Sequence, residues 1–101
     1  MSDAAFKVAD DPASIFVKDT HLASFDGNYA KFATADKRRA QSWIAEGLRS
    51  GRAVFKLNGA YDTFKVEVDM QRVIGAKGRT GIRIIAANDR RVVNAFSFKV
   101  G

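Results

Sequence analysis

The chain has 101 residues, 47% of them hydrophobic, and a formal net charge of +6 at neutral pH. A chain of this length forms one domain with one contiguous core. It contains no cysteine, which excludes disulfides, thiolate zinc sites and a thiol nucleophile, and its single histidine excludes a histidine-rich metal site. We therefore expect neither a metal nor another cofactor. No apolar run approaches the roughly 20 residues that cross a bilayer, so we expect no membrane association by this domain.

The positive charge is concentrated after residue 30. Residues 1–30 hold two Lys and five Asp, whereas residues 31–101 hold fifteen Lys or Arg and six Asp or Glu. This asymmetry favours a polyanionic partner, which could be RNA, DNA or an acidic protein. A soluble basic surface without a dedicated partner is the plain alternative. Nothing in the sequence indicates a homo-oligomer.

The start of the chain divides into two parts. Residues 1–12 are polar and acidic, and we interpret them as a flexible arm or linker that precedes a single domain over residues 13–101. The segment Ser14–Leu22 is short and mixed, with apolar anchors. Periodicity does not decide whether this segment is a helical turn or a short strand.

One helix is predicted, from Thr34 to about Ser50. Its apolar face is formed by Ala40, Trp43, Ile44, Gly47 and Leu48. Thr34 or Asp36 can cap its start, and Gly51 suits the left-handed residue after its end. Three cations crowd the first turn, where the helix dipole disfavours them. A phosphate bound at Arg38 would compensate, although capping by Asp36 with plain solvation is the simpler explanation.

From residue 53 the hydrophobic period changes to two, which indicates half-buried strands. Four strands follow from this alternation: Ala53/Phe55/Leu57, Phe64/Val66/Val68, Ile82/Ile84/Ala86 and Val92/Asn94/Phe96/Phe98. Asn58-Gly59 and Asn88-Asp89 have turn chemistry, and Val73–Ile74 is either a short extra strand or part of a loop. The order predicts an α+β fold in which helical segments pack on one face of a four-stranded antiparallel sheet.

His21 is the candidate catalytic residue. It lies in the polar segment Lys18–Leu22, ahead of the predicted helix. The unperturbed pKa of imidazole, about 6.5, lets it take or give a proton near neutrality. Lys18 can contact RNA phosphate, and Lys31 can complement His21 in proton transfer. The alternative is a surface imidazole without a role.

A second constellation lies at the start of the third strand. Lys77 and Arg79 flank a glycine, and Thr80 and Arg83 follow. Arginine forks match phosphate oxygens, and the Thr80 hydroxyl can donate to a non-bridging oxygen. The segment is no Walker loop, because a strand and not a helix follows. A solvated hairpin loop is the alternative.

The remaining candidates are weaker. Arg91 at the last turn and Asn94 on the last strand could extend the basic face, with Asn94 pointing toward the core or a cleft. Tyr29 and Phe32 are the candidates for stacking on a base. The aromatic side chains within the predicted helix and strands fit core spacing instead. Glu67, which alternates with Asp69, is interpreted as part of the solvent-exposed face of its strand.

Several segments together resemble a known family. These are Lys18–Leu22, Gly27–Phe32, Ala40–Leu48, Ile74–Ile85 and Val93–Phe96. They are similar to the C-terminal toxin domains of contact-dependent growth inhibition and related bacterial polymorphic toxins, in the barnase/EndoU/colicin/RelE-like ribonuclease group. The resemblance implies N-terminal helices followed by a four-stranded antiparallel sheet. It also implies metal-free cleavage of RNA, often tRNA, and neutralisation by an immunity protein, which we expect to be acidic.

On this resemblance His21 corresponds to the catalytic histidine before the helix, and Thr80 with Arg79 or Arg83 to residues that contact phosphate. Many members keep a second histidine, which this chain lacks. The expected reaction is transesterification by the 2′-hydroxyl, which spares DNA. The domain is expected to be secreted or delivered within a larger toxin and to act in the cytoplasm of a target bacterium. The rival hypotheses are a non-enzymatic nucleic-acid-binding module and a protein-inhibitor domain.

Overall fold

The computed structural model describes residues 11–24, 27, 30–58, 63–87 and 91–100. The one α-helix among these residues is α1, Lys37–Arg49. The strands are β1 Val54–Asn58, β2 Thr63–Asp69, β3 Gly81–Ala86 and β4 Val92–Phe98. The 3-10 turns among these residues are η2 Pro12–Ser14, η3 Asp19–His21 and η4 Ala76–Gly78. In the described part of the chain, no helix is long and apolar enough to cross a bilayer.

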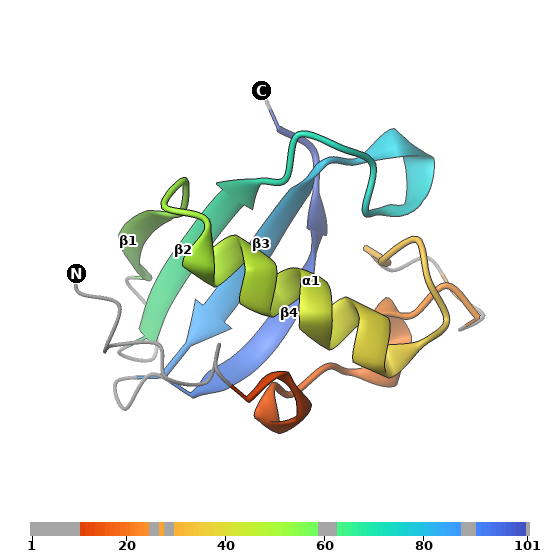
Figure 1. Ribbon diagram of the computed structural model, residues 1–101, viewed down its shortest axis with the longest axis horizontal. Coiled ribbons are helices and arrows are strands. Elements are labelled where there is room, and N and C mark those ends of the chain that lie inside the picture. Colours follow the sequence, from red (N-terminus) through yellow and green to blue (C-terminus); the bar gives the residue numbers. More distant parts are fainter. Residues whose placement is uncertain (1–10, 25–26, 28–29, 59–62, 88–90, 101) are drawn as a thin grey trace.

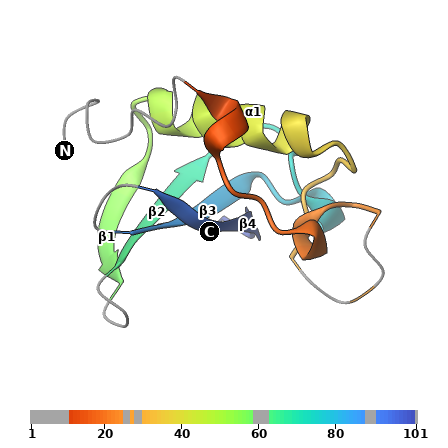
Figure 2. The ribbon, with the colours of Figure 1, turned by 90° about the horizontal axis from the view of Figure 1, so that it is seen from below.

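The four strands form one antiparallel sheet in the order β1-β2-β3-β4. Helix α1 runs diagonally across one face of this sheet, so the molecule has a helix layer and a sheet layer (Figures 1 and 2). This arrangement confirms the predicted α+β class with a helix on a four-stranded antiparallel sheet. The opposite face of the sheet is not covered by α1, and we call it the open face.

The core lies between α1 and the sheet. Its centre is formed by Ile44 of α1 and Ile82 and Ile84 of β3, which are all fully buried. Burying one such side chain contributes about 1.5–3 kcal/mol. The helix approaches the sheet closely at Gly47, where a Cβ atom would lie 2.8 Å from Cγ1 of Val68. Glycine at this position therefore sets the separation of the two layers.

Helix α1 begins three residues later than predicted. Asp36 is its N-cap, and the Asp36 side chain accepts a hydrogen bond from the backbone N–H of Arg38 at 3.0 Å. Thr34 instead accepts from the N–H of Asp36 through Oγ1, so it orders the turn before the helix. Gly51 has φ +78°, as predicted for the residue after the end.

The alternation predicted for two strands is wrong. In β1, an edge strand, Leu57 is 80% exposed and Phe55 is 36% exposed, so no buried face forms there. In β4, Ala95 and Ser97 are buried, while Phe96 and Phe98 lie on the open face. A register shift beside Ile85 explains the reversal in β4, because an irregular pairing interrupts strict alternation.

The segment before α1 packs beside the β4 edge of the sheet (Figure 2). Phe32 forms an isolated antiparallel bridge with Gly75, and the carbonyl of Lys31 accepts hydrogen bonds from the Ala76 N–H and the Ser97 hydroxyl. A Cβ atom at Gly75 would lie 2.7 Å from Oγ of Ser97. These close contacts fix the segment that carries His21 against the sheet.

Candidate functional site

The His21 ring packs against Phe96, whose side chain lies on the open face of β4. Its Nδ1 is 2.6 Å from the carbonyl oxygen of Ala30, and its centroid is 5.4 Å from that of the Phe96 ring. Because a carbonyl can only accept a hydrogen bond, Nδ1 carries a hydrogen. In the neutral ring Nε2 is then the proton acceptor. The ring is therefore oriented, with its chemically useful nitrogen away from the Ala30 carbonyl.

Backbone contacts on both sides hold this imidazole. The N–H of His21 donates to the carbonyl of Lys18, and the carbonyl of His21 accepts from the N–H of Phe32 at 2.8 Å. An ion pair at 2.9 Å joins Asp19 of η3 to Lys37 in the first turn of α1. Both partners are largely exposed, so the ion pair adds little stability. The backbone bonds are the main restraint.

Three side chains lie in one row across the open face. Phe96 of β4 pairs with Arg83 of β3, and Arg83 pairs with Glu67 of β2. Side chains opposite one another on neighbouring strands have Cβ atoms about 4.5–5.5 Å apart. His21, whose ring packs against Phe96 of the edge strand, extends this row at the sheet edge. We call Glu67, Arg83, Phe96 and His21 the open-face row.

The guanidinium of Arg83 has two partners within the protein. Its Nε and Nη2 atoms donate to Oε2 of Glu67 at 2.9 and 2.6 Å. Its central carbon lies 4.6 Å from the centre of the Phe98 ring. Arginine stacked on an aromatic ring and hydrogen-bonded to a carboxylate is oriented before any ligand arrives.

Glu67 is a functional candidate that sequence reasoning missed. Partial burial alone would raise the pKa of Glu67, but hydrogen bonds from Arg83 and Lys56 outweigh this effect and lower the pKa. The carboxylate is therefore ionised at neutral pH, with Lys56 on its Oε1 and Arg83 on its Oε2. The period-two pattern assigned Glu67 to the exposed face, and only the strand register reveals that it faces Arg83.

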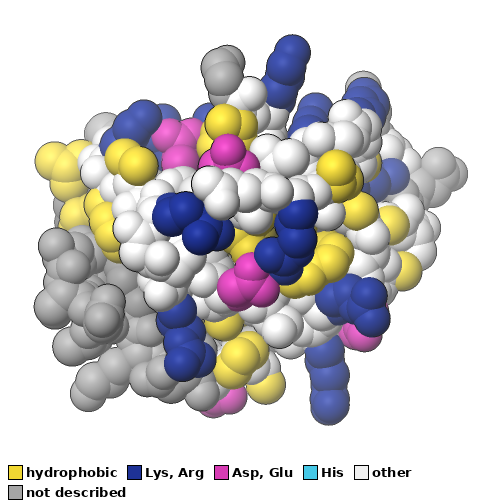
Figure 3. Space-filling model, turned by 45° about the horizontal axis from the view of Figure 1, so that its top comes forward, with side chains coloured by type: hydrophobic (Ala, Val, Ile, Leu, Met, Phe, Trp, Pro, Cys, Tyr) yellow, Lys and Arg dark blue, Asp and Glu magenta, His cyan; other side chains and the backbone are white. Residues whose placement is uncertain are grey.

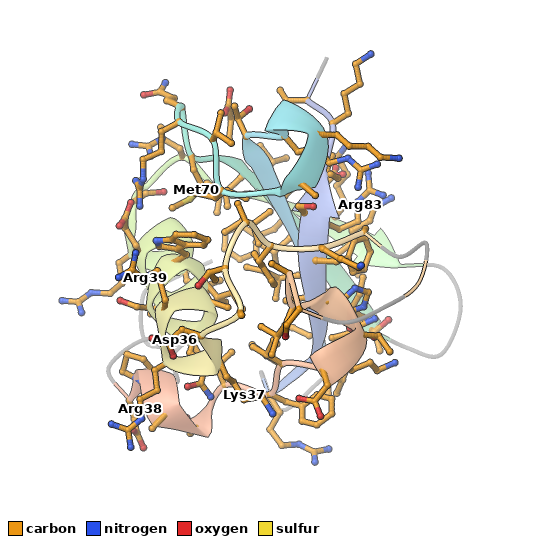
Figure 4. All side chains as sticks on the ribbon, turned by 90° about the vertical axis from the view of Figure 1, so that its right-hand side faces the viewer. Asp36, Lys37, Arg38, Arg39, Met70 and Arg83 are labelled. Atoms are coloured by element: carbon orange, nitrogen blue, oxygen red, sulfur yellow. The ribbon has the colours of Figure 1, made fainter. Side chains whose placement is uncertain are left out.

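A cationic hollow lies at the end of the sheet where β3 begins and β4 ends. It has a volume of about 400 Å³ and is lined by Lys77, Gly78, Arg79, Thr80, Lys99 and Val100. None of these lining residues is a carboxylate. Figure 4 shows nitrogen-tipped side chains around the labelled Arg83 beside η4. The structure thus brings together the predicted residues Lys77, Arg79 and Thr80, and it adds Lys99.

The loop that forms the hollow has a tight backbone. Lys77 has φ +61° and Gly78 has φ +74°, two successive residues in the left-handed region. The N–H groups of Ile74 and Gly75 both donate to the carbonyl of Arg79, which closes the loop on itself. The Thr80 carbonyl accepts from the Met70 N–H at 2.9 Å. The cations therefore project from a hydrogen-bonded turn.

Two predicted base-stacking residues have different outcomes. Phe32 is fully buried in the core and 6.4 Å from the Trp43 ring, so the prediction that it stacks on a base is wrong. No periodic pattern in the sequence around Phe32 indicated its burial, which follows from its bridge to Gly75 and its contact with Trp43. Tyr29 lies outside the described residues.

The other predicted contacts are dispersed. Asn94 is half-buried on the open face opposite Ile85, and its Oδ1 accepts from the N–H of Ala95, so it does not reach the core. Arg91 precedes β4 and Lys99 follows it, which separates them by roughly 26 Å. Arg38 lies far from Arg83 (Figure 4). Neither Arg91 nor Arg38 joins the hollow.

Positive charge is otherwise spread over the surface. The face with α1 toward the viewer shows Lys and Arg side chains scattered, with Asp and Glu among them (Figure 3). Lys18 is exposed beside η3, whereas Lys31 is half-buried and its backbone is held by the sheet. Among the described residues, no group of three or more His, Cys, Asp or Glu could hold a metal ion.

No protein-family model, curated protein or solved structure matches this chain. The functional argument therefore depends on the residues themselves. An oriented imidazole, an ionised carboxylate and a preorganised guanidinium share one row, and a carboxylate-free cationic hollow lies farther along β3 and β4, where β3 begins. These groups can move protons and stabilise the negative charge of a phosphate ester.

Proposed function

We propose that this protein is a metal-independent endoribonuclease that cleaves RNA on the open face of the sheet. The observation that carries the proposal is the open-face row, in which the His21 ring packs at a tilt against Phe96, and Phe96 is followed across the sheet by Arg83 and Glu67. Acid–base catalysis of phosphodiester cleavage requires a proton acceptor, a proton donor and a cation at phosphorus. The row supplies one group for each of these roles.

The proposed reaction is an intramolecular transesterification. Glu67, being ionised, removes the proton from the 2′-hydroxyl, and the 2′-oxygen attacks phosphorus. The bond from phosphorus to the 5′-oxygen breaks, and protonated His21 gives its Nε2 proton to the leaving oxygen. The products are a 2′,3′-cyclic phosphate and a 5′-hydroxyl. If Glu67 serves only to orient Arg83, neutral His21 removes the 2′-hydroxyl proton through Nε2 and the ammonium of Lys31 protonates the leaving 5′-oxygen.

Arg83 stabilises the charge that develops on the phosphate oxygens. Its Nη1 is not among the donors to Glu67, so it can point to a substrate without loss of that ion pair. Removing one preorganised donor of this kind typically costs about 10²–10³ in rate. General acid–base catalysis contributes about 10²–10⁴. Together these terms are large enough for a useful nuclease without a metal.

The sequence resemblance extends this proposal to a barnase/EndoU/colicin/RelE-like toxin. The substrate is then tRNA, and an acidic immunity protein is the natural inhibitor of a chain with net charge +6. Delivery within a larger secreted toxin to the cytoplasm of a target bacterium completes the proposal. The one-helix, four-stranded arrangement is compatible with such a domain.

The proposal is tested with purified protein, total tRNA and excess EDTA. The expected result is cleavage that yields cyclic phosphate and 5′-hydroxyl ends, with an all-deoxy oligonucleotide left intact. A variant His21→Ala that binds RNA in a salt-sensitive manner but does not cut it supports the role of His21. Binding without cleavage by the wild-type protein would instead identify a nucleic-acid-binding module.

A further inference from the structure

The cationic hollow is chemically distinct from the open-face row. Its three cations, Lys77, Arg79 and Lys99, have no ion-pair partner among the described residues. In the row, by contrast, Glu67 is bound to both Arg83 and Lys56 and offsets much of their charge. The hollow is therefore the stronger attractor for an anion, although it lies outside the row.

The hollow is also displaced from the row along the strands. Thr80 lines the hollow and precedes Arg83 by three residues, which places the two Cα atoms roughly 10 Å apart. On the neighbouring strand, Phe98 lies under Arg83 and Lys99 follows directly. The hollow is therefore placed for a different phosphate of an RNA strand from the one that contacts Arg83.

The walls of the hollow are fixed by close packing. A Cβ atom at Gly81 would lie 2.7 Å from Cγ2 of Val100 and 2.8 Å from Cδ1 of Phe98, so Val100 and Phe98 are packed against the β3 backbone. Val100 is 39% exposed and gives the hollow one apolar wall. An apolar wall beside three cations suits a sugar next to a phosphate better than an isolated small anion.

We propose that the hollow is a phosphate subsite for the nucleotide next to the cleaved linkage. It binds the neighbouring phosphodiester of an RNA strand, with Arg79 and Lys99 as charge partners and Thr80 as a hydroxyl donor. The substrate class is then an oligonucleotide with at least two phosphates, which is preferred over a dinucleoside monophosphate. This inference rests on the proposed ribonuclease function.

The test compares kcat/KM for a dinucleoside monophosphate with kcat/KM for a longer oligoribonucleotide of the same cleavable step. The wild-type protein is expected to prefer the longer substrate, and Lys99→Gln and Arg79→Gln to reduce this preference about tenfold each. Arg39→Gln is the matched control, because it removes an equal charge from the exposed side of α1, away from Arg83 (Figure 4). An equal loss in the control, or an equal loss on both substrates, would overturn the subsite.

A second measurement separates failure of the subsite from failure of the nuclease. Binding of an all-deoxy oligonucleotide is measured against salt concentration, because this ligand has no 2′-hydroxyl to react. Loss of one phosphate contact lowers the slope of log K against log salt by about 0.7 for a single strand. A lower slope in Lys99→Gln but not in Arg39→Gln supports the hollow even if the wild-type protein cuts no RNA. An unchanged slope in Lys99→Gln refutes it.

Discussion

Replacement of His21 by two different residues separates its chemistry from its packing. The Nδ1–H of His21 donates to the carbonyl of Ala30, and the ring packs on Phe96. The side-chain amide nitrogen of asparagine occupies nearly the position of Nδ1. His21→Asn therefore keeps the hydrogen bond and removes Nε2, whereas His21→Ala removes the bond, the ring and Nε2 together.

The two variants are expected to differ in stability and to agree in activity. A hydrogen bond contributes about 0.5–1.5 kcal/mol and an aromatic pair about the same. His21→Ala should therefore lower the free energy of unfolding by about 1–3 kcal/mol, and His21→Asn by about 0.5–1.5 kcal/mol. In a domain of this size each kcal/mol shifts Tm by about 4–8 °C. Both variants should lose about 10²–10⁴ in kcat for RNA cleavage.

Thermal unfolding and single-turnover cleavage of tRNA provide the two measurements, at a temperature where both variants are folded. Near-wild-type cleavage by His21→Asn would refute the assignment of proton transfer to Nε2. Equal stability losses in the two variants would contradict the hydrogen bond to Ala30 as a restraint on the ring.

Three further predictions concern the fold and its response to pH. Gly75→Ala places a Cβ atom 2.7 Å from Oγ of Ser97 and should cost about 1–3 kcal/mol. Ser97→Gly removes its hydrogen bond to Lys31 as well as this clash, so the double variant should lose less stability in denaturant unfolding than the sum of the two single variants. Additive losses would exclude this contact as the cause. Phe32→Ala should cost about 3–5 kcal/mol by calorimetry because the ring is fully buried, and a loss below 1 kcal/mol would place it outside the core. The lowered pKa of Glu67 means that its folded state favours the charged form, so its contribution is present above the unfolded pKa of about 4.5 and is lost as the pH falls through the lower folded value. Glu67→Gln should therefore flatten the decline of Tm below pH 5, and an unchanged slope would show that its ion pairs do not stabilise the fold.

Strands β2 and β3 and helix α1 were predictable from the sequence because their hydrophobic residues recur with a regular period. Val66 and Val68 in β2 and Ile82 and Ile84 in β3 are buried as their alternation predicts, because both strands are central in the sheet and have one face under α1. The helix was predicted with its main apolar face, and Gly51 has the backbone conformation expected of it.

The features that were not predicted depend on how the strands pair, which the hydrophobic periodicity of one segment does not indicate. The exposure of Leu57 follows from the position of β1 at the sheet edge, and the outward position of Phe96 follows from the irregular pairing beside Ile85. The register that places Glu67 beside Arg83 is likewise a property of strand pairing. For a charged residue on the exposed face of a strand, the neighbouring sequence does not indicate which residue lies opposite it on the next strand.

The contact between Ser97 and Lys31 has a consequence for the order of assembly. The Ser97 hydroxyl donates to the Lys31 carbonyl across 66 residues of sequence, and the His21 ring packs against Phe96 of the same strand, β4. During synthesis the N-terminal part of a chain emerges first, so this contact forms only after Ser97 has been made, and bringing two such distant segments together has an entropic cost. His21 is therefore synthesised before Phe96, the residue of β4 against which its ring packs. The proposed role of His21 therefore requires that β4 has docked.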